Sequence, residues 1–206
     1  MTVRAILAAG LAFLLTACGG DEAEESAAPG VAQICGDPRL AGNRVAPIGD
    51  GGGDGGCGIA APVAVTGVMG LTMEGRATLN CTTARALADW VETGLIPADR
   101  LTRSRVTGFR VAASYACRGR NHQPGARLSE HAFGNAIDIS EFSFADGSVR
   151  DVRSGWNDVR QDDWFRRIHR AACGPFGTVL GPESDRFHQD HFHFDVARYR
   201  SGPYCR

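Results

Sequence analysis

Short apolar stretches separated by polar residues run through most of the chain and predict a domain that contains several strands. Stretches of strand-like length and residue type occur at residues 62–68, 106–115, 134–139, 149–152 and 192–197. We therefore expect these five segments to pair within one sheet.

Two other stretches repeat their apolar residues with a helical period. The first runs from Thr82 or Thr83, either of which can cap its start, to about Thr93, and Gly94 is expected to end it. The second covers residues 162–173 and carries acidic residues first and arginines later, the order that the helix dipole favours. Because the elements follow no regular βαβ repeat, we expect an α+β fold with a mainly antiparallel sheet and flanking helices.

The N-terminal segment has a different composition from the rest. A short apolar run follows Arg4 and ends in Leu15-Thr16-Ala17-Cys18, which resembles the lipobox of bacterial lipoproteins, although an ordinary secretory signal is the alternative. We expect a lipoprotein signal peptide over residues 1–17, with lipidation at Cys18. A flexible acidic tether over residues 18–33 and one folded domain over residues 34–206 would follow.

This reading places the protein in the periplasm, anchored by lipid. Gly19 follows Cys18, and in Gram-negative lipoproteins the absence of Asp at that position favours the outer membrane. Membrane contact is expected through the lipid alone. The formal net charge of −1 gives no electrostatic case for nucleic acid as a partner. We expect a monomer.

Cysteine usage agrees with an oxidising compartment. The chain has seven cysteines, and setting Cys18 aside leaves an even number that suits three disulfides in an exported protein. The spacing leaves their pairing open, although a Cys35–Cys57 bond would close the glycine-rich loop at 49–56. The candidate disulfide residues are Cys35, Cys57, Cys81, Cys117, Cys173 and Cys205.

A split cluster of His and Asp carries the candidate chemistry. His131 is followed seven residues later by Asp138, and His191 and His193 lie two residues apart near the C-terminus. Imidazole and carboxylate are the usual ligands of catalytic zinc, which keeps three protein ligands and one open position. On a strand, His191 and His193 would share one face, while neighbouring phenylalanines would point into the core. The pattern therefore predicts a Zn²⁺ site with a base beside it, and hence a hydrolase.

The same residues carry a family resemblance. Ser129-x-His131-x-x-Gly134-x-Ala136-x-Asp138 resembles the motif of zinc D-alanyl-D-alanine carboxypeptidases. The ending His188-x-x-His191-x-His193 resembles that of penicillin-insensitive murein endopeptidases. More closely, residues from about 56 to 206 resemble the bacterial extensin-like C-terminal domain family. The further matching segments are Cys57-Gly58-Ile59, the Trp90 helix, Ser114-Tyr115-Ala116-Cys117-Arg118, Leu180-Gly181-Pro182 and His191-Phe192-His193.

The resemblance implies a fold like that of the hedgehog domain and the zinc DD-peptidases, and a role for each site residue. It implies zinc ligands at His131, Asp138 and His193. It implies that His191 activates the zinc-bound water or stabilises the oxyanion, and we favour His191 as the base, with His188 and Asp190 as the alternatives. We disfavour Asp190 because, on a continuous strand, it would point away from His193.

The remaining role falls to Arg118, which matches an arginine that would neutralise the charge developing on the substrate. The expected function is a zinc-dependent peptidase, either carboxypeptidase or endopeptidase, that cleaves the stem or cross-link peptides of peptidoglycan. The alternative is a catalytically silent zinc protein that only binds the cell wall.

Overall fold

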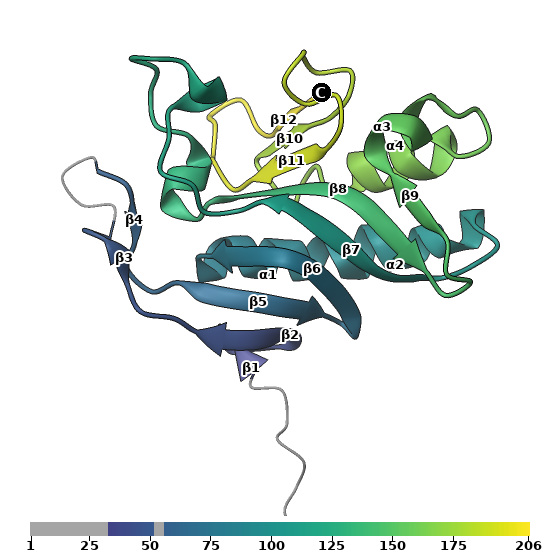
Figure 1. The fold of residues 1–206 in the computed structure, drawn as a ribbon, viewed down its shortest axis with the longest axis horizontal. Helices are drawn as coiled ribbons and strands as arrows, with labels where there is room; N and C mark the ends of the chain where they lie inside the picture. Colours follow the sequence, from purple (N-terminus) through teal and green to yellow (C-terminus); the bar gives the residue numbers. More distant parts are fainter. Residues whose placement is uncertain (1–32, 52–55) are drawn as a thin grey trace, which may run out of the picture. The chain divides into compact units, whose positions relative to one another are not determined.

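The computed structural model describes residues 33–51 and 56–206, and one large sheet forms the frame of this part of the chain (Figure 1). The expected signal peptide, Cys18 and nearly all of the expected tether lie outside the described residues. In chain order the strands are β1 (Gln33–Ile34), β2 (Asp37–Arg44), β3 (Ile48–Gly49), β4 (Gly58–Ile59), β5 (Val63–Val68), β6 (Leu71–Leu79), β7 (Val106–Ala113), β8 (Ala136–Phe144), β9 (Val149–Asp151), β10 (Thr178–Leu180), β11 (Phe192–Asp195) and β12 (Tyr204–Cys205).

Ten of these strands join in the order β1-β2-β5-β6-β7-β8-β11-β10-β12, with β9 paired to β8, while β3 and β4 form a separate pair. Neighbours within the large sheet run antiparallel except β6–β7 and β10–β12. The parallel pair β6–β7 requires a long crossover, which the first helices provide. The domain is therefore α+β with a mainly antiparallel sheet, as the order of elements predicted.

The helical segments pack beside the sheet, with α1 and α2 along β5–β7 and α3 and α4 near β9 (Figure 1). Within the described residues no helix has the length and apolar character needed to cross a membrane. The segments are α1 (Cys81–Trp90), the π-helical η2 (Val91–Leu95), α2 (Ile96–Ala98), the 3₁₀ segments η3 (Asp99–Leu101), η4 (Arg120–His122) and η5 (Glu130–Phe133), α3 (Val152–Asn157) and α4 (Asp162–Ala171).

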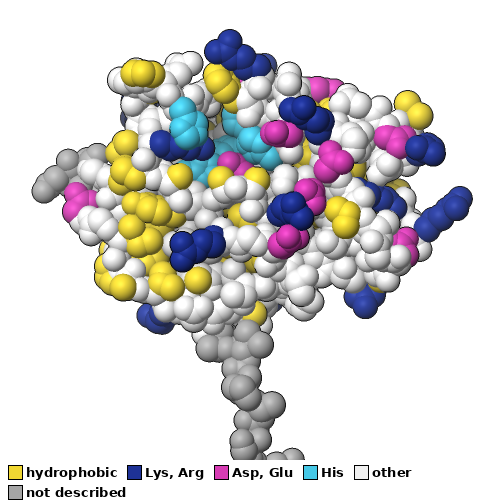
Figure 2. All heavy atoms as spheres, in the orientation of Figure 1, with side chains coloured by type: hydrophobic (Ala, Val, Ile, Leu, Met, Phe, Trp, Pro, Cys, Tyr) yellow, Lys and Arg dark blue, Asp and Glu magenta, His cyan; other side chains and the backbone are white. Residues whose placement is uncertain are grey.

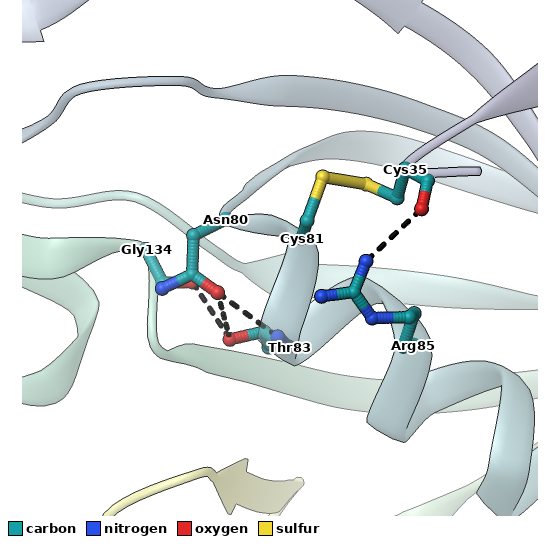
Figure 3. Close-up of a disulfide and its surroundings, with 6 residues drawn as sticks. All are labelled: Cys35, Asn80, Cys81, Thr83, Arg85 and Gly134. Carbon is teal, nitrogen blue, oxygen red and sulfur yellow. Dashed lines mark hydrogen bonds between the residues drawn. A yellow bond between two sulfur atoms is a disulfide. The ribbon is translucent and has the colours of Figure 1, made fainter. Parts of the chain in front are cut away.

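The first helix differs from its prediction at both ends. Its cap is Asn80, whose side chain accepts a hydrogen bond of 2.9 Å from the Thr83 amide, so neither threonine is the cap. The Thr83 hydroxyl instead donates to the carbonyl of Gly134 (Figure 3). Gly94 does not end the helix but lies within η2. A Cβ atom there would lie 2.7 Å from the side chain of Ala171, so Gly94 allows α4 to approach closely.

The sequence did not predict five strands of the large sheet, which are β1, β2, β6, β10 and β12. The segment Asp37–Arg44 contains Pro38 and Gly42, which are uncommon within strands. In Leu71–Leu79 the middle residues are exposed or half-buried, and Thr178–Leu180 is only three residues long. These segments become strands because they pair with neighbouring strands of the sheet. Of the predicted strand 134–139, the N-terminal part is a turn, and β8 instead extends to Phe144.

Aromatic side chains fill the core between the sheet and the helices. Trp90 is fully buried, and its ring meets those of Phe109, Phe142 and Phe194 at centroid distances of 5.2–6.5 Å. Its indole N–H donates to the carbonyl of Ile168 on α4. The core therefore joins the crossover helix, the central strands and α4 in one packed unit.

Three disulfides fasten the edges of the domain. They join Cys35 to Cys81, Cys57 to Cys117 and Cys173 to Cys205. The suggested Cys35–Cys57 bond is wrong. Cys35 follows β1 and lies beside the first residue of α1 (Figure 3), whereas Cys57, at the end of the glycine-rich loop, reaches the segment after β7.

Candidate metal centre

The centre is built on the paired strands β8 and β11. Asp138 and His193 lie directly opposite each other in the antiparallel register, so their side chains leave the same face of the sheet. The residues that flank them, including Ile137 and Phe192, are fully buried on the other face. One face of this strand pair therefore belongs to the core, and the other carries the polar side chains.

His131 comes from outside the sheet, in the short helical turn η5. The hydroxyl of Ser129 accepts a hydrogen bond from the His131 amide and caps the turn, and Gly134 closes it with a positive φ of 65°. A Cβ at Gly134 would lie 2.3 Å from the side chain of Ile59 and 3.0 Å from the backbone nitrogen of Asn80. Glycine is thus required here for both conformation and space. The turn directs His131 over β8.

Three potential metal-ligand atoms meet above the strand pair. The Nδ1 of His193 lies 2.8 Å from Oδ1 of Asp138, and the Nε2 of His131 lies 3.2 Å from Oδ2 of the same carboxylate. The two ring nitrogens are themselves 3.2 Å apart. All three side chains are buried. They form a group whose ligand atoms lie within 4.8 Å of one another.

The outer ring nitrogens of both histidines face hydrogen-bond acceptors. His131 Nδ1 lies 2.5 Å from the backbone carbonyl of Ser114, and His193 Nε2 lies 3.2 Å from the carboxylate of Asp195. A carbonyl can only accept, so Nδ1 of His131 carries the hydrogen. In neutral rings, the lone pairs of the inner nitrogens then point toward the Asp138 carboxylate.

This donor set suits zinc. Zinc binds histidine nitrogen and carboxylate oxygen at about 2.0–2.1 Å, and a tetrahedron with such bonds has edges of about 3.3 Å. Each inner imidazole nitrogen lies 2.8 Å or 3.2 Å from a different oxygen of the Asp138 carboxylate, and the two nitrogens are 3.2 Å apart, so these spacings are close to that edge. Metal-bound histidines usually donate their second N–H to a carbonyl or carboxylate, as the outer nitrogens of His131 and His193 are placed to do.

The electrostatics of the cluster also favour a cation. Burial opposes ionisation of Asp138, but hydrogen bonds with His131 and His193 outweigh it and hold the pKa of the carboxyl well below its usual range. Burial likewise opposes the charged form of His193, yet its contacts with Asp138 and Asp195 raise the pKa of the imidazole. The site thus keeps its carboxylate ionised and attracts positive charge.

His191 lies at the edge of the cluster, immediately before β11. Its Nε2 is 3.8 Å from Oδ2 of Asp138, and its Nδ1 is 2.9 Å from Oδ1 of Asp190. Asp190 itself is mostly exposed, lies outside the cleft and is 3.7 Å from Arg153. The structure therefore brings His191 to the ligands and places Asp190 behind it, although both residues precede β11 and the assumed continuous strand does not reach them.

A second histidine has the same kind of partner. His188 contacts Asp185 with 2.7 Å between Nδ1 and Oδ1, and its ring lies 5.5 Å from that of His193. His188 and His191, which lie beside the ligand group, therefore each have Nδ1 next to a carboxylate. The sequence did not indicate a role for Asp185, because this residue matches no motif position and lies in a loop.

The cluster lies at the bottom of an open cleft of about 370 Å³. Figure 2 shows histidines and an acidic group in this hollow, with basic side chains around it. Arg118 lines the cleft, and among the described residues it has no carboxylate within ion-pair distance. Within the described residues its guanidinium makes one hydrogen bond, a long one of 3.5 Å to the Gly119 carbonyl. The guanidinium is thus available to an anionic or carbonyl group.

Two contributors to the site were weakly signalled by the sequence. Asp195, on the same strand face as His193, was as readily explained as a surface residue, but it is buried and contacts the imidazole. Ser114 contributes through its backbone carbonyl, which no residue pattern reveals. By contrast, His122 is exposed, and His169 is buried away from the cluster, so neither joins it.

Comparison with known families places the chain. The model of a family described as extensin-like protein C-terminus matches residues 36–206, and the chain belongs to that family. No curated protein and no solved structure matches it.

Proposed function

We propose that this member of the extensin-like C-terminal family is a zinc-dependent peptidase that cleaves peptide bonds in the stem or cross-links of peptidoglycan. The observation that carries the proposal is the buried group of His131, Asp138 and His193 with His191 beside it. A site that only held a structural metal would need no further histidine at its open side.

In this proposal His131, Asp138 and His193 hold the zinc. Bound zinc supplies Lewis acidity and lowers the pKa of a coordinated water to about 7. His191 accepts the proton from the attacking water through Nε2, because Asp190 holds the hydrogen on Nδ1. His188, whose Nδ1 faces Asp185, is the alternative base.

Two further parts complete the proposed mechanism. Arg118 donates to the carbonyl oxygen of the cleaved bond as negative charge develops there, an interaction typically worth a few kcal/mol. Asp190 acts on His191 and does not itself contact the substrate, since its carboxylate lies outside the cleft. The mainly antiparallel sheet that carries the ligands is consistent with a fold like that of hedgehog and DD-peptidase domains.

The proposal includes a location. We propose that Cys18 is lipidated and holds the domain at the periplasmic face of the outer membrane, where the acidic tether lets it reach the wall. Three disulfides in the domain are in keeping with an oxidising compartment. Fractionation of cells that express Cys18→Ala should find the protein in the soluble periplasm. Retention of that variant in the membrane would contradict the anchor.

Digestion of purified peptidoglycan tests the activity. Zinc-loaded protein should release peptides or amino acids that mass spectrometry identifies, and the released fragment distinguishes a carboxypeptidase from an endopeptidase. His193→Ala is the matched inactive control. If the zinc-loaded protein sediments with peptidoglycan yet releases nothing, the function is binding alone and the peptidase proposal fails.

A further inference from the structure

Three exposed aromatic residues line the cleft, and we refer to them together as its aromatic wall. Phe187, Tyr199 and Tyr204 are 37%, 43% and 47% exposed, and they are the aromatic members of the exposed large hydrophobic residues in the described part of the chain. All three line the cleft that holds the His–Asp cluster. Exposed aromatic residues concentrated beside a polar centre indicate a ligand-binding surface.

Each of these residues has contacts that hold it in place. The Phe187 amide donates to Asp185 Oδ1, the same atom that contacts His188. The Tyr199 hydroxyl lies 3.1 Å from the hydroxyl of Thr178 on β10. The wall is therefore preorganised, which reduces the entropy lost when a ligand binds.

Strand pairing, a neighbouring disulfide and a backbone hydrogen bond hold Tyr204 in place. It belongs to β12, which pairs with β10, and the adjacent Cys205 is bonded to Cys173. Its amide donates to the carbonyl of Gly177 at 2.7 Å. The guanidinium of Arg206 lies 5.3 Å from the centre of its ring, yet nearly half of the residue is still exposed. Tyr204 therefore keeps exposed surface in the lining of the cleft.

We propose that this aromatic wall is a subsite for a sugar ring of the glycan to which the cleaved peptide is attached. A pyranose ring has an apolar C–H face and a rim of oxygens, and the cleft offers matching groups. The rings of Phe187, Tyr199 and Tyr204 present apolar faces, and the tyrosine hydroxyls and Arg118 supply polar groups. The choice of an N-acetylated amino sugar rests on the proposed function, because that sugar carries the peptides of peptidoglycan.

Calorimetric titration of the purified full chain with a linear tetramer of N-acetylglucosamine tests the subsite. The wild type should bind the tetramer, and Tyr204→Ala should weaken binding by at least about tenfold, as truncation of a central aromatic contact typically does. Tyr204→Phe keeps the ring and should retain most of the affinity. Leu101→Ala, which is exposed elsewhere and does not line the cleft, is the matched control and should bind like the wild type.

A second measurement needs no variant. Nuclear Overhauser contacts between tyrosine ring protons and the C–H face of the sugar are expected in the wild-type complex. The subsite is overturned if the wild type does not bind the tetramer, if Tyr204→Ala binds it equally well, or if the rings contact only the free stem peptide.

Hydrolysis of peptidoglycan, measured on the same preparations, separates this inference from the proposed function. Protein that cleaves peptidoglycan but ignores the tetramer would retain the peptidase proposal and lose the sugar subsite. Protein that binds the tetramer through Tyr204 but cleaves nothing would lose the peptidase proposal and retain the subsite.

Discussion

Two buried histidines on opposite sides of β11 have opposite surroundings. His193, on the polar side, contacts the carboxylates of Asp138 and Asp195, which raise the pKa of its imidazole. His169, on α4, packs against the rings of Phe192 and Phe194, and burial lowers the pKa of its imidazole to about 4. The surroundings therefore favour the charged form of histidine on the polar side of β11 and the neutral form on the apolar side.

The difference originates in the alternation of a single strand. Successive side chains of Phe192–Asp195 point to opposite faces, so the phenylalanines meet α4 while His193 and Asp195 meet the cleft. The apolar side packs in the core, and the polar side carries the proposed metal ligand His193. Substitutions on the two sides should consequently alter different measurements.

The largest effect is expected from His193→Ala, which removes one of the three proposed ligands. Zinc content should fall from near one ion per chain to near zero, and hydrolysis of peptidoglycan should become undetectable. Elemental analysis of protein purified without added metal measures the first, and peptide release measures the second. His122→Ala replaces an exposed histidine outside the ligand group and should keep its zinc. Full zinc content in His193→Ala would refute the ligand assignment.

The next largest effect distinguishes metal binding from catalysis. His191→Ala should keep its zinc and lose about 10² to 10⁴ in turnover, the usual range for a general base. Asp190→Asn should lower turnover by a smaller factor with unchanged zinc, because an amide can donate to Nδ1 and displace the hydrogen to Nε2. Peptide release under saturating substrate measures both variants.

One result would reassign the base. If His191→Ala turns over as fast as the wild type, the proton acceptor lies elsewhere, and His188→Ala becomes the decisive variant. The matched control for Asp190→Asn is Asp185→Asn, which changes the equivalent partner of His188.

The sequence predicted β11 well because alternation is a local signal. Phe192 and His193 differ so clearly in polarity that their opposite faces follow from the two-residue period. Asp190 lies in a turn before β11, so the strand rule does not determine its direction. The meeting of His131, Asp138 and His193 in one group rested on a family motif, since no local rule brings a turn and two strands together.

What the sequence left open depends on contacts between distant residues. The Ser114 carbonyl beside His131 is a backbone group and has no residue signature. The disulfide of Cys35 depends on the path of β1 relative to α1, which residue spacing does not determine. Gly94 gave the signal of a helix end, but tight packing against α4 explains it better.

On the apolar side, Phe194→Ala should lower the free energy of unfolding by about 3–5 kcal/mol, because it removes a fully buried ring and leaves a cavity. Urea denaturation of metal-free protein measures this change. Zinc content of the folded variant should remain near that of the wild type. Phe187→Ala, an exposed phenylalanine, is the matched control and should cost far less. A loss of zinc in folded Phe194→Ala would show that the two sides of β11 are not separable.

The smallest effect concerns the pH dependence that His169 adds to folding. Its pKa is lowered to about 4 in the folded protein, from an ordinary value of 6.5, and burial is the main cause. Above pH 6.5 the imidazole is neutral in both states and has no effect. As the pH falls from 6.5 toward 4, His169 becomes protonated in the unfolded chain but stays neutral in the folded protein. The free energy of unfolding therefore decreases.

At pH 5 the loss from this one group should be about 2 kcal/mol, at 1.36 kcal/mol for each pH unit. Arg166, Arg170 and Glu183 also act on His169, and their opposing charges leave burial dominant. Because other groups titrate in the same pH range, the effect of His169 is measured as a difference between the wild type and a variant. Between pH 7 and pH 5, the free energy of unfolding of His169→Gln should fall by about 2 kcal/mol less than that of the wild type. Equal pH slopes in the two proteins would mean that His169 is protonated in the fold, and that the apolar side of β11 accommodates charge as the cleft does.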